Sequence, residues 1–121
     1  MPVRSLNSSV LVWPNRRQVN DAVRRWALNE ARSRQEIRRI GYFGSYARGD
    51  WGVGSDLDLL VLLRGSAAAR APLALESLPV PADALVYTLD QWERLRGERG
   101  RIFRTVEEEA LWIFRAGSPL V

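Results

Sequence analysis

The sequence predicts a single domain in which helices cover a β-sheet. The chain has 121 residues, the usual length of one domain, and 46% of them are apolar, an ordinary share for a globular protein. Apolar segments of strand length alternate with segments that have the spacing of amphipathic helices. We therefore expect one domain over residues 1–121.

The first expected element is a helix over about residues 15–34. Asn15 follows Pro14 and can cap the helix. One apolar stripe runs along it at helical spacing, formed by Val19, Ala22, Val23, Trp26 and Ala27. The arginines of this segment lie mostly on the other side, and we interpret them as a solvated face rather than a nucleic-acid surface.

Two strands separated by a turn and a loop follow. Residues 37–43 have strand character and lead into a Gly-Ser pair. Residues 46–48 begin a short helix, and residues 49–55 hold three glycines, which is typical of a loop. Residues 56–63 are mostly Leu and Val, as expected of a central strand that is buried on both faces.

A weaker helix and a third strand come next. The helix is expected over residues 67–77, where Pro72 interrupts it, and the strand over residues 83–88. Thr88 or Asp90 then caps a helix over about residues 91–96.

The last expected elements are a helical turn and a strand over residues 111–115. Thr105 and Glu108 have the spacing of a capping box, so we expect the turn to begin there. The glutamates at 107–109 are then interpreted as charges at a helix start, where the helix dipole favours them.

The composition excludes several kinds of chemistry. The absence of cysteine excludes disulfides and thiolate metal sites, and the absence of histidine excludes a Ser-His-Asp triad. Any metal must therefore be held by oxygen, which favours Mg²⁺ or Mn²⁺. All 18 basic residues are arginines and the net charge is +4. This balance fits a phosphate-rich ligand or an acidic partner, and a compositional bias explains it equally well.

The sequence indicates neither a membrane span nor export. No apolar run approaches the ~18 residues that a membrane helix needs. The first residues are not followed by the apolar region and cleavage site of a signal peptide. We expect a cytoplasmic protein.

Two aspartates, Asp56 and Asp58, stand at the start of the predicted central strand. Because side chains alternate along a strand, both carboxylates point to the same face. Two adjacent anions repel, and burying them near leucines costs free energy. A divalent cation offsets both effects, so the pair predicts a metal site.

The Gly44-Ser45 pair at a strand-to-helix turn complements these aspartates. Such a turn supplies backbone N–H groups and a hydroxyl, which suit a phosphate. Each feature is weak alone, but the joint pattern, with ten residues between Ser45 and Asp56, is specific. A phosphate site facing a paired-carboxylate metal site predicts nucleotide chemistry.

This pattern resembles the minimal nucleotidyltransferases of the polymerase-β-type superfamily. The matching runs are Phe-Gly-Ser-Tyr-Ala-Arg-Gly, which ends at Gly49, and Ser-Asp-Leu-Asp-Leu-Leu-Val, which ends at Val61. The resemblance implies an α+β fold with a mixed sheet flanked by helices, and a catalytic core over about residues 36–115. It also implies two Mg²⁺ ions at Asp56 and Asp58, with Gly44 and Ser45 holding the triphosphate.

The resemblance also implies a third carboxylate on the next strand, where Asp83 stands. Asp83 would be a metal ligand and the general base; a turn-capping aspartate after Pro81 is the alternative, and Asp90 and Glu93 are fallbacks. Arg48 would contact a nucleotide phosphate or form a structural salt bridge. Two aromatic residues that flank the site could stack on a base or simply pack: Tyr46 and Trp51.

The implied reaction transfers a nucleoside monophosphate, favouring AMP from ATP, to an acceptor hydroxyl. One metal lowers the pKa of the acceptor oxygen and the other stabilises the leaving pyrophosphate. Because the chain ends soon after the core, we expect a second protein to supply the acceptor. Minimal nucleotidyltransferases of this form resemble antitoxins whose partner, encoded nearby, is a small helical HEPN ribonuclease toxin modified on a tyrosine.

Two other functions remain open at this point. The chain could be a catalytically silent module that blocks its partner by contact, or a transferase acting on a small molecule such as an antibiotic, or on RNA. A nucleic-acid substrate is not favoured. The five tryptophans could form an interface or simply fill the core.

Overall fold

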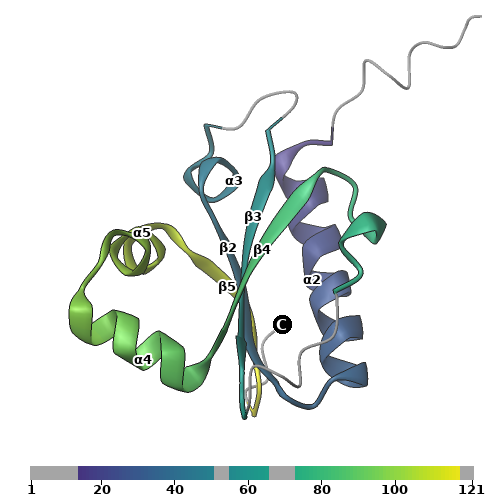
Figure 1. Ribbon diagram of the computed structural model, residues 1–121. Helices are drawn as coiled ribbons and strands as arrows, with labels where there is room; N and C mark the ends of the chain where they lie inside the picture. Colours follow the sequence, from purple (N-terminus) through teal and green to yellow (C-terminus); the bar gives the residue numbers. More distant parts are fainter. Residues whose placement is uncertain (1–13, 51–54, 66–72, 118–121) are drawn as a thin grey trace, which may run out of the picture.

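The computed structural model describes residues 14–50, 55–65 and 73–117, and these form a four-stranded sheet with helices on both faces (Figure 1). The helices are α2 (Arg16–Ser33), α3 (Ser45–Arg48), α4 (Leu89–Glu98) and α5 (Arg101–Glu109), with a 3₁₀ turn, η2, at Leu75–Ser77. The strands are β2 (Ile37–Phe43), β3 (Leu57–Leu63), β4 (Ala82–Thr88) and β5 (Leu111–Arg115). The expected single α+β domain is confirmed.

The sheet is mixed, with the strand order β4-β3-β2-β5. β3 and β4 run parallel, and β2 is antiparallel to both β3 and β5. The first residues of β3 and β4 therefore lie at the same edge of the sheet as the last residues of β2. This topology brings three segments distant in sequence to one place.

Each face of the sheet has its own hydrophobic core. α2 packs Val23 and Trp26 against one face, and α4 and α5 pack Trp92 and Phe103 against the other (Figure 1). β3 serves both cores, because alternate residues such as Leu59 and Leu60 enter opposite clusters. It is the buried central strand that the sequence predicts.

Side-chain caps fix the starts of two helices. The side chain of Asn15 accepts from the backbone N–H of Gln18, and the reciprocal bond completes a capping box. Thr88 and Gln91 form the same arrangement at the start of α4. The cap is therefore Thr88, and the alternative, Asp90, lies in the first turn of α4 instead.

The prediction for the C-terminal helix was wrong. α5 begins at Arg101 after Gly100 and ends at Glu109, so Thr105 and Glu108 do not open a helix. The three consecutive glutamates lie in the last turn, where the helix dipole disfavours anions. The error arose because the buried face of α5 begins at Phe103, before the capping signature, and continues at Val106 within it, a helical spacing that the prediction overlooked.

The helix expected over residues 67–77 is also not borne out where the structure describes it. Residues 73–77 contain only the 3₁₀ turn η2, and the preceding part of this prediction lies outside the described residues. None of the described helices is both long and apolar enough to cross a membrane.

Candidate active site

Acidic side chains from two parallel strands meet at the edge of the sheet. Asp56 directly precedes β3, Asp58 is the second residue of β3, and Asp83 is the second residue of β4. The register pairs Asp58 with Asp83, and paired residues of parallel strands project from the same face. Leu60 and Leu62 follow Asp58 on this face and pack beneath α4 and α5. The carboxylates of Asp58 and Asp83 thus lie on the α4–α5 side of the sheet.

The electrostatics of Asp58 show that these carboxylates act on one another. Burial raises the pKa of Asp58, and the charges of Asp83 and Asp56 raise it further, while Arg48 opposes the shift. Asp58 has no hydrogen-bond or ion-pair partner among the described residues. A half-buried carboxylate with like charges beside it is a place where a cation would be favoured.

Gly44 lies directly against this carboxylate. Its φ angle is +81°, a conformation that favours glycine, and a Cβ added here would collide with Asp58 Oδ2. The pairing of Phe43 with Asp58 fixes this close approach, because Gly44 is the next residue after β2. Sequence and geometry therefore agree that position 44 must be glycine.

α3 follows Gly44 and holds the remaining residues of the turn. Ser45 is its first residue and makes no hydrogen bond through its hydroxyl with the described residues. Tyr46 is fully buried in the core on the α2 side, so it packs and is not available to stack on a base. Trp51, the other aromatic candidate, lies outside the described residues.

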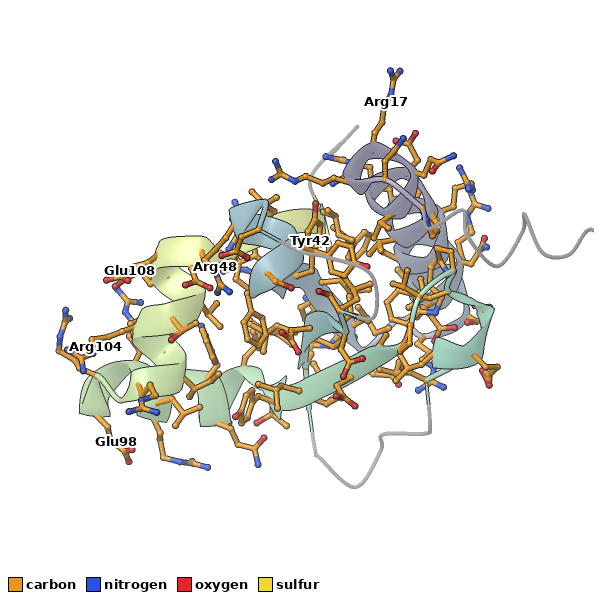
Figure 2. All side chains as sticks on the ribbon, turned by 90° about the horizontal axis from the view of Figure 1, so that it is seen from above. Arg17, Tyr42, Arg48, Glu98, Arg104 and Glu108 are labelled. Carbon is orange, nitrogen blue, oxygen red and sulfur yellow. The ribbon has the colours of Figure 1, made fainter. Side chains whose placement is uncertain are left out.

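Arg48 makes two charge-assisted hydrogen bonds. Its Nε donates to Asp50 Oδ2 at 3.0 Å and its Nη1 donates to Glu109 Oε1 at 3.1 Å, and Figure 2 shows Arg48 between α3 and α5. These bonds, first that to Asp50, raise the pKa of Arg48. The structural salt bridge expected as one alternative is thus present, and Nη2 makes no hydrogen bond to the part of the chain that the structure describes.

Glu109 is the residue that the sequence did not point to. Its Oε1 also accepts a hydrogen bond from the backbone N–H of Gly44 at 3.3 Å. It thereby connects the end of α5 to the turn beside Asp58. The only signal in the sequence was its place in a run of three glutamates. Because the helix boundary was predicted wrongly, this run was interpreted as the start of a helix instead of its end.

The carboxylates suit a divalent cation without forming a closed site. Within the three described ranges, no three acidic side chains converge tightly enough to hold an ion. Their oxygens are the ligands that Mg²⁺ and Mn²⁺ prefer, and the uncompensated charge at Asp58 fits such an ion. Mg²⁺ commonly completes its shell with substrate phosphates, so a full protein cage is not expected.

The family follows from a comparison with known protein families. The model of the nucleotidyltransferase domain matches residues 24–113, which include the turn and all three aspartates. The chain belongs to the nucleotidyltransferase domain family. The expectation of an enzyme of this class is confirmed, whereas the roles of its individual site residues remain predictions.

Solved structures share the fold of this nucleotidyltransferase. A protein from Sulfolobus solfataricus described as a nucleotidyltransferase has a TM-score of 0.60 and 16% identity, with 88% of each chain covered. A toxin–antitoxin structure with AMP-PNP has a TM-score of 0.54 and 20% identity, covering 78% of this chain and 74% of that one. A mutant of the MntA–HpeT toxin–antitoxin has a TM-score of 0.52 and 18% identity, with the same coverage. No curated protein matches the sequence significantly.

Proposed function

We propose that this nucleotidyltransferase transfers AMP from ATP to a hydroxyl group, and that the acceptor is a tyrosine of a small helical toxin of the HEPN class. The observation that carries the chemistry is the pairing of Asp58 with Asp83 beside the Gly44 turn. Like charges opposite each other on neighbouring strands destabilise a sheet. A chemical function therefore explains this pair better than a structural one.

The residues of the site have separable tasks in this proposal. Asp56, Asp58 and Asp83 hold Mg²⁺ or Mn²⁺, which when bound would neutralise the phosphates and stabilise the leaving pyrophosphate. Gly44 and Ser45 bind the triphosphate, and Arg48, whose Nε and Nη1 hold Asp50 and Glu109, contributes Nη2 to a phosphate oxygen.

Asp83 is the residue we assign to the acceptor. It is exposed, whereas Asp58, its partner on the neighbouring strand, is partly buried, so Asp83 is more accessible to a second molecule. As a carboxylate within reach of an acceptor hydroxyl, it would take the proton when the oxygen attacks the α-phosphate.

A protein acceptor is favoured by two of the structural relatives. Both are named as toxin–antitoxin structures, and one was determined with AMP-PNP, an ATP analogue. The proposal places the reaction in the cytoplasm, with the toxin encoded nearby. The arginines of α2 would attract an acidic surface of the partner. Arg17 extends into solvent in Figure 2, and Arg16 donates to Ala47 O at 3.0 Å beside the site.

The tryptophans that the structure describes add little support to this interface. Trp26 and Trp92 are buried in the two cores, which is the alternative that the sequence left open. Trp112 is half-buried, with the Arg39 guanidinium 5.3 Å from its ring centroid. Partner binding must therefore rest on other residues than Trp26 and Trp92.

Co-expression with the adjacent gene product, followed by intact mass spectrometry of that product, tests the proposal. The expected result is a mass increase of one or more AMP units that is lost in Asp56→Ala. An adjacent product that is bound but never modified would favour the silent binding module. A product that is neither bound nor modified would favour a small-molecule transferase, which a screen of hydroxyl-bearing antibiotics with ATP would then test.

A further inference from the structure

We infer that Glu109 is a positioning residue that holds the Gly44–Ser45 turn in its nucleotide-binding conformation. The inference rests on the proposed function and extends it to a residue outside the expected motif. One oxygen, Oε1, accepts from the backbone N–H of Gly44 at 3.3 Å and from Arg48 Nη1 at 3.1 Å. The carboxylate therefore ties together both ends of the short segment that includes Ser45.

The place of Glu109 in α5 argues that these contacts are not incidental. The last turn of α5 contains three glutamates and no basic residue, so each carboxylate there lies at the unfavourable end of the helix dipole. Glu107 and Glu108 are exposed to water, which screens them, whereas Glu109 is only 23% exposed. The Gly44 N–H and the Arg48 guanidinium offset what burial and the dipole would otherwise cost.

The sheet fixes the distance between Glu109 and the turn. Leu111, two residues after Glu109, pairs with Tyr42, two residues before Gly44. This pairing brings the end of α5 close to the turn that follows β2. The contact between Glu109 and the turn therefore follows from the pairing of β2 with β5.

We call the two contacts of Glu109, to the Gly44 N–H and to Arg48 Nη1, the Glu109 clamp. This clamp holds groups that the proposed chemistry uses. Gly44 lies against Asp58, so a shift of the turn would change the space available to that carboxylate. Glu109 engages only Nη1 of Arg48, and within the described ranges neither Nη2 nor the Ser45 hydroxyl has a hydrogen-bond partner, so both could contact a phosphate. The competing possibility is that Glu109 occupies a phosphate position and that nucleotide must displace it.

Three variants separate these roles. Glu109→Ala removes the clamp, Glu109→Gln retains a neutral acceptor for the Gly44 N–H, and Glu108→Ala is the matched control that removes an exposed charge from the same helix end. The first readout is amide hydrogen exchange of the peptide that contains residues 44–48, measured without nucleotide. The second is the affinity for AMP-PNP with Mg²⁺, measured by calorimetry.

The clamp predicts that Glu109→Ala speeds exchange in this peptide and weakens AMP-PNP binding, each on the order of tenfold, because a charge-assisted acceptor is lost. Glu109→Gln should recover part of both, and Glu108→Ala should change neither. Unchanged exchange in Glu109→Ala, or AMP-PNP binding that is equal or tighter, would overturn the inference.

Lack of AMP-PNP binding by the unmutated protein would instead contradict the proposed function, while the exchange data still decide whether Glu109 holds the turn. If Glu109→Ala does not fold, the comparison of Glu109→Gln with Glu108→Ala decides both readouts.

Discussion

Replacing Asp58 by asparagine should stabilise the metal-free protein and abolish transfer. The pKa of Asp58 is raised by burial and by the charges of Asp83 and Asp56, and no hydrogen bond to a described residue compensates the carboxylate. Asparagine keeps the shape of the side chain and removes the charge. The same substitution removes an anion that the proposed metal site requires, so stability and activity should change in opposite directions.

The geometry of the sheet sets the size of the effect. Asp58 and Asp83 are partners on neighbouring strands, which lie about 4.8 Å apart. Two unit charges at that distance repel by about 1 kcal/mol in water and by about 3 kcal/mol at an effective dielectric constant of 20. Because Asp83 is exposed and solvent screens the pair, we expect the lower figure, about 1 kcal/mol, or a rise of roughly 3–5 °C in melting temperature.

Thermal unfolding in EDTA at neutral pH measures this difference, with Asp56→Asn as the matched control. Asp56 is exposed, and its charge raises the pKa of Asp58 less than the charge of Asp83 does. Its substitution should therefore stabilise the protein less. Both variants should lose transfer. If Asp58→Asn melts at the same temperature as the unmutated protein or below it, or if Asp56→Asn stabilises equally, the electrostatic reasoning is refuted.

The sign of the pH dependence follows from the same shift. The folded pKa of Asp58 lies above its ordinary value of 3.8, so the ionised group destabilises the native state at neutral pH. As the pH falls through the folded pKa, Asp58 takes up a proton and this destabilisation disappears. The advantage of Asp58→Asn should therefore shrink as the pH falls from 7 toward about 4; an advantage that grows on acidification would contradict the shift.

Three other predictions concern the turn, the metal and a cap. Gly44→Ala should abolish transfer and lower the melting temperature, measured by labelling and thermal unfolding, because its Cβ would collide with Asp58 and its φ is +81°. EDTA should weaken ATP-analogue binding at least tenfold in calorimetry, because the phosphates complete the metal shell; equal affinity with EDTA and with Mg²⁺ would count against the site. Thr88→Ala should cost about 1 kcal/mol of stability in denaturant unfolding, because it removes the cap of α4, with transfer retained.

The sequence predicted the parts of the site that depend on local spacing. The period of two in a strand predicts a common direction for Asp56 and Asp58, and a glycine before a helix predicts a tight turn, so both predictions need only a few neighbouring residues. The helices capped by Asn15 and Thr88 were predicted for the same reason.

Features that depend on long-range pairing could not be derived in this way. The register that places Asp83 opposite Asp58 is set by the packing of β3 and β4, and only the family resemblance suggested it. Glu109 reaches Gly44 across 65 positions of the sequence, through the pairing of β5 with β2. A helix boundary misplaced by a few residues was enough to hide its contact with the turn.

The most direct test of the central claim is transfer of label from ATP. Purified protein, co-expressed with the adjacent gene product and supplied with Mg²⁺, should transfer label from α-labelled ATP and release pyrophosphate, with no transfer from γ-labelled ATP. Asp58→Asn should transfer none. Label taken from the γ position, or near-normal α-labelling by Asp58→Asn, would show that the paired carboxylates do not catalyse nucleotidyl transfer.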